Sequence, residues 1–371
     1  MTKRFERQIA LPGFGEESQR KLRQSGILVI GAGGLGCPAL LYLAAAGIGR
    51  IGIADGDRVD VSNLHRQVLF SEQDLGKEKA STAALQLGKK FPDTAFIPFD
   101  EYVRTDNVAT ILSGFDIILD GSDNFETRYL VSDACGLLGK PLVFGAVHQN
   151  EGQISVFHHP DERGMAFNYR DLHPVPPAQD QIPNCQQTGV LGVLPGTLGV
   201  MMASEAIKVL TGYGKTLSGE MLYFNLLRNS FYELAMMPDP EGRKKIPGSF
   251  QELQAKDYRL ECNKGTEIKW KDAIEIKNAA PAETVIIDVR ETTEMPELIR
   301  AECWRIPLDQ LEQNFTPLSK FNRILVFCQT GGRSLAAAAM LSRVFPDKMI
   351  ASIEGGIIAF LHQNSFDSHE G

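Results

Sequence analysis

A short apolar run that passes straight into a glycine-rich turn limits the folds open to this chain more than any other part of the sequence. Residues 27–30 read Ile-Leu-Val-Ile, and Gly31-Ala-Gly-Gly-Leu-Gly36 follows before a helix-compatible stretch that starts at Pro38. A strand, a Gly-x-Gly-x-x-Gly turn and a helix together let the backbone approach a phosphate at the N-terminus of the helix. The sequence therefore predicts a nucleotide-binding unit, whose cofactor-binding glycines are Gly31, Gly33, Gly34 and Gly36.

The remaining apolar runs predict the larger fold around this unit. Runs at 51–54, 117–120 and 142–146 alternate with helical patterns near 78–90 and 127–138, which is typical of a doubly wound parallel sheet. A stretch rich in Pro and Gly at 238–248 precedes a second alternating pattern, with strand-like runs at 284–287 and 324–327 and a helix-like run at 334–343. We expect an α/β fold class, with a Rossmann-like doubly wound domain at 1–237, a linker at 238–248 and a smaller α/β domain at 249–371.

Charge and hydropathy exclude several classes of protein. The 371 residues carry 38 basic and 46 acidic side chains, a net charge of −8, and no basic block that would mark a nucleic-acid partner. No stretch approaches the roughly 18 uninterrupted apolar residues of a membrane span. The first residues lead into no apolar signal-peptide core. We therefore expect a cytoplasmic protein with no nucleic-acid or membrane partner.

The six cysteines are spread too widely for a disulfide framework or a Cys-x-x-Cys metal site, since no two lie closer than 25 positions. Two of them, Cys185 and Cys328, lie in segments with other chemistry-bearing residues. Packing in a core is the role expected of the other four, which are Cys37, Cys135, Cys262 and Cys303.

The polar residues after the second apolar run distinguish two nucleotide chemistries. Asp55 could hold a ribose hydroxyl at the end of a strand, as in nicotinamide-dependent oxidoreductases. Arg66 and Lys79 favour a triphosphate instead, because positive donors spread the charge that develops on a phosphate. Asp123 follows the run 117–120 at the carboxyl edge of the sheet, where a carboxylate could hold Mg²⁺. Any one of these side chains could be a surface residue, but their joint occurrence favours an ATP site.

Residues 1 to about 235 resemble the adenylating family of ubiquitin-activating-type enzymes, in its MoeB/ThiF branch, which activates small sulfur-carrier proteins. The matching blocks are Arg4–Ile9, the glycine loop, Asp55–Gln67, Lys79, Asp120–Asn124, Cys185–Gly196 and Glu205–Lys208. The resemblance implies that Asp123 binds Mg²⁺ and that Arg7 reaches across a homodimer interface as an arginine finger. The residues that it implies for ATP binding are Asp55, Asn63, Arg66, Gln67 and Lys79.

The same resemblance implies the chemistry. The C-terminal glycine carboxylate of a ubiquitin-like carrier ending in Gly-Gly would attack the α-phosphate of ATP, giving an acyl-adenylate and pyrophosphate. Arg66, Lys79 and Mg²⁺ would neutralise the phosphate charge, and no general base is needed because the nucleophile is already ionised.

Two further features of the first domain concern cysteine. Cys185 follows a proline-rich loop at 173–183 and could attack the adenylate, although a small packed residue is the alternative. Many relatives hold structural zinc with two Cys-x-x-Cys pairs. Residues 167–171 and 236–240, where those pairs would fall, carry no thiolates, so we predict no zinc site.

The second domain carries a cysteine at the end of an apolar run. Gln-Thr-Gly-Gly leads from Cys328 to Arg333 and into a helix, and backbone N–H groups, the helix N-terminus and Arg333 would favour the thiolate. With Asp288, Arg290 and Ile353–Gly356, this loop resembles that of rhodanese, or sulfurtransferase, domains across residues 249–371. Four residues separate Cys328 from Arg333, where cysteine phosphatases usually have five, which favours a persulfide carrier. Asp288 and Arg290 would brace the loop.

The two halves together predict an ATP-dependent adenylyltransferase and sulfurtransferase that converts the carrier's C-terminus to a thiocarboxylate. The pathway would be molybdopterin or thiamine biosynthesis, tRNA thiolation or a related one, and a cysteine desulfurase or thiosulfate would supply the sulfur. Joining both activities in one chain raises their effective concentration. The alternative is a nucleotide- and carrier-binding regulatory protein that transfers no sulfur.

Overall fold

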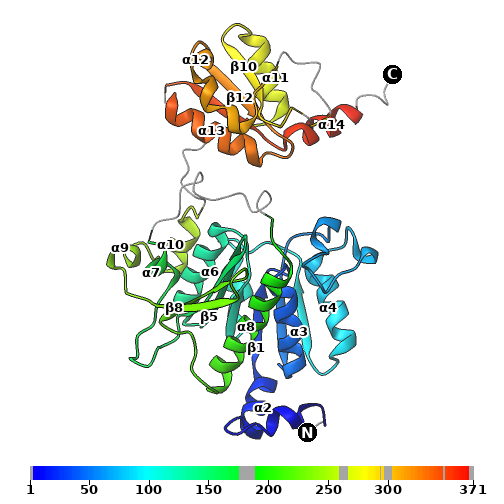
Figure 1. Cartoon of the computed structure of the whole chain (residues 1–371), viewed down its shortest axis with the longest axis vertical. Helices are drawn as coiled ribbons and strands as arrows, with labels where there is room; N and C mark the ends of the chain where they lie inside the picture. Colours follow the sequence, from blue (N-terminus) through cyan, green and yellow to red (C-terminus); the bar gives the residue numbers. More distant parts are fainter. Residues whose placement is uncertain are drawn as a thin grey trace. The chain divides into compact units, whose positions relative to one another are not determined.

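The computed structural model describes residues 3–174, 189–258, 266–292, 294–295, 303–345 and 347–366. These residues divide into two compact units, unit 1 up to residue 258 and unit 2 from residue 266. Figure 1 shows that each unit is a sheet with helices packed against it, as the alternating pattern predicts.

Unit 1 is built on an eight-stranded sheet in the order β3-β2-β1-β4-β5-β6-β7-β8. The strands β3, β2, β1, β4 and β5 run parallel, and β6 to β8 continue the sheet antiparallel. Their bounds are β1 Gly26–Ile30, β2 Arg50–Ala54, β3 Ala95–Phe99, β4 Ile117–Asp120, β5 Leu142–His148, β6 Glu151–Phe157, β7 Glu220–Asn225 and β8 Ser230–Ala235. The doubly wound sheet is therefore confirmed, and each predicted apolar run of this domain lies within a strand.

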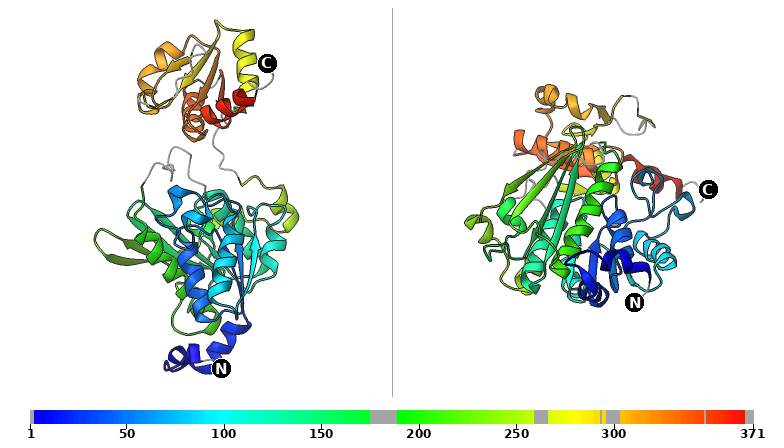
Figure 2. Two further views of the ribbon diagram at one scale, coloured as in Figure 1. Left: turned by 90° about the vertical axis from the view of Figure 1, so that its right-hand side faces the viewer. Right: turned by 60° about the horizontal axis from the view of Figure 1, so that its bottom comes forward.

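Helices cover both faces of this sheet, as Figure 2 shows from two further directions. The apolar core on one face is supplied by α2 (Gly15–Gln24), α3 (Gly36–Ala46), α4 (Lys79–Lys90) and α8 (Val193–Thr211). The core on the other face is supplied by α5 (Val108–Ser113), α6 (Phe125–Leu138), α7 (Tyr169–Leu172) and α10 (Phe250–Ala255). The short η1 (Lys3–Phe5) and α1 (Glu6–Ile9) precede α2.

Helix α8 is long and apolar enough, by length and composition alone, to cross a membrane. Within unit 1 it packs against α3, β5 and β6, and Leu198, Met202 and Ala206 are buried there. These contacts are those of a core helix in a globular domain.

The stretch 238–248, expected to be a linker, is instead attached to unit 1. It contains α9 (Pro240–Arg243), which contacts α7, and it leads to α10, which contacts α6. Leu253 and Tyr258 are buried in the core of unit 1. Asp239 caps α9 by accepting a hydrogen bond from the N–H of Gly242, so the Pro and Gly of this stretch form a capped helical turn.

Unit 2 contains an all-parallel five-stranded sheet in the order β11-β10-β12-β13-β9. The strands are β9 Thr266–Ile268, β10 Thr284–Asp288, β11 Cys303–Arg305, β12 Arg323–Phe327 and β13 Met349–Ile353. Its helices are α11 Trp270–Ala279, α12 Phe315–Leu318, α13 Gly332–Val344 and α14 Gly356–Phe366, with short turns η5 Leu308–Gln310 and η6 Glu312–Asn314. The predicted strands at 284–287 and 324–327 and the helix at 334–343 are confirmed.

Candidate active sites

The glycine loop of unit 1 lies between the carboxyl ends of β1 and β4, where the strand order of the sheet reverses. A Cβ on Gly31, whose φ is +87°, would lie 3.1 Å from the carbonyl oxygen of Gly121 after β4. A Cβ on Gly36 would lie 1.8 Å from the carbonyl oxygen of Gly31. The loop therefore accepts only glycine at these positions, and it sits in the crevice where doubly wound sheets bind ligands.

Lys79 is the first residue of α4, and its side chain is almost entirely buried. Its Nζ donates a hydrogen bond of 2.9 Å to Oδ2 of Asp57, and the hydroxyl of Tyr102 donates to Oδ1 of the same carboxylate. Burial raises the pKa of Asp57, but the hydrogen bonds from Tyr102 and Lys79 outweigh it, so this pKa lies below its ordinary value. The bond to Asp57 also raises the pKa of Tyr102, to about 12. Lys79 is thus a fixed cation beside the loop.

Asp55 ties this cation to the glycine loop. Its two carboxylate oxygens accept hydrogen bonds from the N–H groups of Ala32, at 2.7 Å, and Asp57, at 2.8 Å. Burial raises the pKa of Asp55, and the positive charge of Lys79 opposes this rise. Each oxygen keeps a further lone pair, so Asp55 can still accept a hydrogen bond from a ribose hydroxyl.

A second polar group lies beside the loop, around the 3₁₀ turn η2 (Val61–Asn63). Oδ1 of Asn63 accepts hydrogen bonds of 2.9 Å from both Arg66 and Gln67. The stem of Arg66 passes Gly34, because a Cβ on that glycine would lie 3.5 Å from the Arg66 Cδ. Gln67 is buried, its Nε2 makes the bond to Asn63, and its Oε1 has no partner. Among the described residues, no ion pair joins Arg66 to a carboxylate.

Asp123 lies beyond the end of β4, and its side chain is exposed. Its negative charge raises the pKa of Tyr102, after the larger effects of Asp57, burial and Asp55, so Asp123 faces the same group of residues. Mg²⁺ at nucleotide sites uses one or two carboxylates together with phosphate oxygens and water, and an exposed carboxylate at this position fits that role. No group of three or more metal-ligating side chains occurs among the described residues.

The segment that enters α8 closes the site. A Cβ on Gly192 would lie 2.4 Å from the carbonyl oxygen of His65, and a Cβ on Gly34 would lie 3.1 Å from the Pro195 side chain. The chain after the proline-rich loop thus returns onto the residues predicted to bind ATP. Cys185 lies outside the described residues, so its role stays a prediction.

Arg7 is not brought to the glycine loop of its own chain. It is exposed on α1, and its neighbour Gln8 donates a hydrogen bond of 3.1 Å to the carbonyl of Ala46, where α3 ends. The glycine loop lies at the other end of α3, a helix of 11 residues, and at 1.5 Å per residue this separates the two by about 16 Å.

The segments 167–171 and 236–240, in which the sequence predicts no zinc site, are joined by a carboxylate. Oδ1 of Asp171 accepts hydrogen bonds from the N–H of Asp239, at 2.9 Å, and from Nε of Arg243, at 2.6 Å. A second bond of 2.9 Å runs from Arg243 to Oδ2. The side chain of Asp171 is fully buried, so this ion pair is a structural link between α7 and α9.

In unit 2, Cys328 directly follows β12 and is buried. Its Sγ accepts hydrogen bonds from the N–H of Gly331, at 3.2 Å, and from the hydroxyl of Ser334, at 3.6 Å. The loop rests on Gly356, because a Cβ there would lie 2.3 Å from the Cys328 carbonyl oxygen, which also accepts a bond from the N–H of Ile357. Of the backbone N–H groups predicted to surround the sulfur, that of Gly331 is hydrogen-bonded to it, and the second donor is a side-chain hydroxyl.

Each arginine near this cysteine is paired with a carboxylate. Arg290 is fully buried and binds Asp288 through both Nε and NH2, while its NH1 donates 3.3 Å to the side chain of Gln329 in the loop. Arg333 binds Glu294 through two hydrogen bonds. The pair of Asp288 and Arg290 braces the loop as predicted, whereas Arg333, predicted to favour the thiolate, is paired with Glu294.

Sequence reasoning overlooked three of these residues. Asp57 and Tyr102 fix Lys79, and Glu294 holds Arg333, yet none belongs to a motif that we singled out for it. The one sequence signal for Glu294 is its place six positions after Asp288, where a strand ends and a carboxylate could reach the loop that follows a neighbouring strand.

Two family models match the chain. ThiF family matches residues 5–244, and Rhodanese-like domain matches residues 270–363. Among curated relatives, the sulfur carrier protein adenylyltransferase of Thermus thermophilus is 48% identical over 238 residues, covering 64% of this chain and 88% of the relative. The probable adenylyltransferase/sulfurtransferase MoeZ of Mycobacterium tuberculosis is 36% identical and covers 97% of this chain and 93% of its own length. The adenylyltransferase and sulfurtransferase MOCS3 of Drosophila yakuba is also 36% identical, covering 98% and 83%.

Solved structures share the fold. Escherichia coli MccB, crystallised with MccA-N7isoASN, has a TM-score of 0.56 at 19% identity, covering 65% of this chain and 74% of that one. PaaA has a TM-score of 0.54 at 21% identity, covering 63% and 73%. At these identities the similarity is one of architecture.

Proposed function

We propose, from the premise that this chain belongs to the ThiF family and continues into a rhodanese-like domain, that both parts act on one carrier protein. The chain is an adenylyltransferase and sulfurtransferase: it adenylates a sulfur carrier and transfers sulfur to it. The observation that carries this function is the presence in one chain of a cation-flanked glycine loop and a cysteine loop whose backbone N–H faces the sulfur.

Adenylation needs positioning and charge neutralisation more than covalent chemistry. A carboxylate oxygen of the carrier's C-terminal glycine attacks the α-phosphorus of ATP, the bond to the β-phosphate breaks, and pyrophosphate leaves. The glycine loop admits the phosphates close to its backbone, and Arg66 and Lys79 neutralise charge on either side of it. Mg²⁺, held by Asp123 and the phosphates, would supply further charge neutralisation.

Sulfur transfer uses Cys328 in unit 2. The terminal sulfur of its persulfide attacks the acyl carbonyl of the adenylate, and AMP leaves. A thiol then attacks Sγ of Cys328, so that a disulfide with Cys328 forms, the original sulfur–sulfur bond breaks and the thiocarboxylate leaves. Gly331 N–H and the Ser334 hydroxyl donate hydrogen bonds to Sγ and so hold the atom that carries the transferable sulfur. In the adenylation half of the chain, Cys185 is the thiol that we propose for attack on the adenylate. The carrier is ubiquitin-like and ends in Gly-Gly, and the sulfur comes from a cysteine desulfurase or from thiosulfate.

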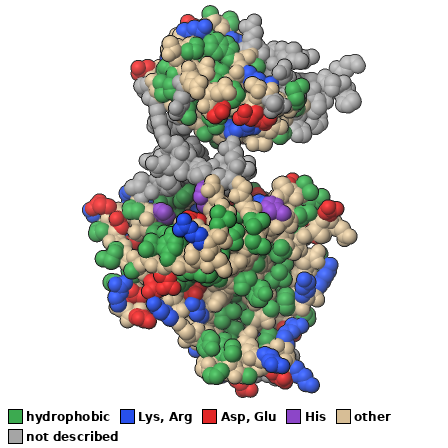
Figure 3. All heavy atoms as spheres, viewed as in Figure 1, with side chains coloured by type: hydrophobic (Ala, Val, Ile, Leu, Met, Phe, Trp, Pro, Cys, Tyr) green, Lys and Arg blue, Asp and Glu red, His purple; other side chains and the backbone are tan. Residues whose placement is uncertain are grey.

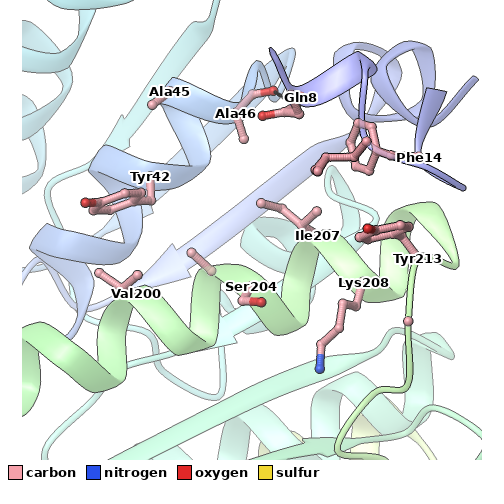
Figure 4. Close-up of a pocket in the computed structure, with 13 residues that line it drawn as sticks. Gln8, Phe14, Tyr42, Ala45, Ala46, Val200, Ser204, Ile207, Lys208 and Tyr213 are labelled. Atoms are coloured by element: carbon pink, nitrogen blue, oxygen red, sulfur yellow. Dashed lines mark hydrogen bonds between the residues drawn. The ribbon is translucent and has the colours of Figure 1, made fainter. Parts of the chain in front are cut away.

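A homodimer is supported by the apolar surface of α3 and α8. Figure 3 shows hydrophobic side chains gathered over this face, and exposed members include Tyr42 and Val193. A cavity of about 500 Å³ opens there between α1, α3 and α8, and Tyr42 and Val200 point into it with Gln8 at its edge (Figure 4). A second copy docked on this face would receive Arg7, the neighbour of Gln8, which cannot serve the glycine loop of its own chain.

The cellular setting is proposed on the charge and hydropathy of the sequence. The protein is cytoplasmic, and its pathway is molybdopterin or thiamine biosynthesis, tRNA thiolation or a related thiolation.

The experiment that tests this function is ATP–pyrophosphate exchange with a panel of carriers that end in Gly-Gly. We expect exchange that requires both Mg²⁺ and one carrier, and Asp123→Asn should lower it at least about 100-fold. Asp116→Asn, on a side chain that binds the N–H of Gly26 at the opposite edge of the sheet, is the matched control and should retain exchange. Tight binding of a reduced nicotinamide cofactor without ATP binding would contradict the proposal. Carrier binding without any exchange would favour the regulatory alternative.

A further inference from the structure

Glu294 forms an ion pair with Arg333, the arginine that follows the cysteine loop. NH1 of Arg333 donates 2.5 Å to Oε1 of Glu294, and NH2 donates 2.7 Å to Oε2, so the two groups form a bidentate pair. The side chains of Arg333 and Glu294 are only 19% and 28% exposed. The NH1–NH2 edge of the guanidinium, with which arginine grips oxyanions, is therefore already filled by a carboxylate.

The position of Glu294 is fixed by its own turn. Oε1 also accepts a hydrogen bond of 2.8 Å from the N–H of Glu291, whose carbonyl accepts 3.0 Å from the N–H of Glu294. Arg305, on β11, donates to the carbonyls of both glutamates. The hydrogen bonds from Arg333 lower the pKa of Glu294 to about 2, so the carboxylate is ionised at neutral pH. The turn around Glu294 therefore holds the carboxylate in position for its pair with Arg333.

The two kinds of sulfur donor place different demands on Arg333. Thiosulfate is a dianion, and its sulfonate oxygens need a cation that is free to bind them. A persulfide carries its transferable sulfur without a sulfonate group, so it needs only access to Sγ and a leaving thiolate. A loop whose arginine is already neutralised therefore suits a persulfide donor better than thiosulfate.

We propose that Glu294 is a specificity-determining residue, which occupies Arg333 and so discriminates against thiosulfate in favour of persulfide donors. This inference rests on the sulfurtransferase function proposed above and chooses between the donors left open there. In the favoured step the Cys328 thiolate attacks the terminal sulfur of R–S–SH, the sulfur–sulfur bond breaks, and R–S⁻ leaves. Cys328 then carries –S–SH, and no external oxidant or reductant is required.

The test compares two donors on the full-length protein. Loading of Cys328 is followed by intact mass spectrometry with glutathione persulfide and, separately, with thiosulfate. We expect wild-type kcat/KM for thiosulfate to be at least about 100-fold below that for the persulfide. Glu294→Gln should raise kcat/KM for thiosulfate about 10-fold, mainly through a lower KM, and change the persulfide value by less than about twofold.

Glu291→Gln is the matched control, since it removes the same charge from the same turn without breaking the pair with Arg333. It should leave the donor ratio within about twofold of wild type. If E294Q does not fold, Glu294→Asp replaces it: the shorter carboxylate reaches the guanidinium less well and should give a smaller gain with thiosulfate, about threefold.

Three results would overturn the inference. The first is equally fast loading of wild-type protein from both donors. The second is a folded E294Q or E294D variant with an unchanged donor ratio, and the third is an equally strong shift of that ratio in E291Q. If wild-type Cys328 loads from neither donor, the proposed sulfurtransferase function fails as well, and this result is distinct from an unchanged ratio.

Discussion

The Nζ atom of Lys79 lies 2.9 Å from Oδ2 of Asp57, so a nearly buried ammonium lies beside the glycine loop with its charge balanced by a carboxylate. An unpaired charge at such a site would cost several kcal/mol, and Asp57 removes that cost. Asp57 is held by Tyr102 and takes one of the three ammonium donors, so the cation is fixed in place and keeps donors for a phosphate.

Removing the ammonium should therefore stop the first reaction. Lys79→Met is expected to lower ATP–pyrophosphate exchange at least about 100-fold, because one preorganised donor at a developing phosphate charge is worth that much. Lys90→Met, at the exposed end of the same helix, is the control and should keep the wild-type rate. A K79M protein that exchanges at more than half the wild-type rate would show that Lys79 is not part of the site.

The glycine loop gives a prediction on stability and activity together. Gly36→Ala would put a methyl group 1.8 Å from the Gly31 carbonyl oxygen, so it should lower the free energy of unfolding by about 3 kcal/mol and abolish exchange. Gly88→Ala, on α4, meets only the ring of Phe96 at 4.0 Å and should raise stability by up to about 1 kcal/mol. Calorimetry of both variants checks whether the first lowers and the second raises the free energy of unfolding. Equal destabilisation by both would refute the prediction.

The carboxylate link between α7 and α9 predicts that stability does not depend on zinc. Treatment with a chelator should leave the unfolding midpoint unchanged, whereas Arg243→Ala should cost about 1–3 kcal/mol by removing hydrogen bonds to the buried Asp171. Lys244→Ala, which breaks only an exposed ion pair with Glu241, should cost less than about 0.5 kcal/mol. A midpoint that falls after chelation would mean that a metal stabilises this unit.

Glu294 gives the pH dependence of unit 2. Its pKa in the folded state is about 2, below the ordinary value of 4.5, so its ionised form stabilises the fold at neutral pH. That contribution is present above pH 4.5 and is lost as the pH falls toward 2. Both tryptophans, Trp270 and Trp304, lie in unit 2, so their fluorescence in urea follows this unit within the whole chain.

Wild-type protein should be more stable than E294Q at pH 7, and the difference should shrink between pH 4.5 and 2. E291Q keeps the pair of Glu294 with Arg333 and should follow the wild-type curve. An E294Q difference that stays constant over this range would show that ionisation of Glu294 contributes nothing.

The buried parallel strands were predictable because both faces of each strand are covered. β1, β4 and the start of β5 are fully buried, so each reads as a continuous apolar run. β3 and β8 are edge strands with exposed side chains, and neither reads as a buried strand, because Pro98 interrupts the apolar run of β3 and β8 carries the polar Ser230 and Glu233. The composition of 238–248 suggested a linker. The hydrogen bond that anchors this stretch to unit 1 runs from the N–H of Asp239 to Asp171, 68 residues away, and composition does not reveal a contact between such distant residues.

The site was predictable wherever a local motif marks it. The glycine loop, the Asn63–Gln67 segment and the Cys328 loop are each continuous in sequence, and the structure forms a compact arrangement from each. Tyr102 and Asp57 are 45 residues apart, and Arg333 and Glu294 are 39 apart. Pairs at such distances depend on which strands become neighbours, and a single sequence does not state that.

Intact mass spectrometry of the carrier tests the central claim most directly. After incubation with this protein, Mg·ATP and a persulfide donor, a carrier ending in Gly-Gly should gain roughly 16 mass units, one sulfur in place of one oxygen. Cys328→Ser should abolish that gain while ATP–pyrophosphate exchange continues, and Cys303→Ser, on β11 two strands away in the same sheet, should preserve it. A carrier that gains this mass with C328S, or that never gains it while exchange proceeds, would contradict the account.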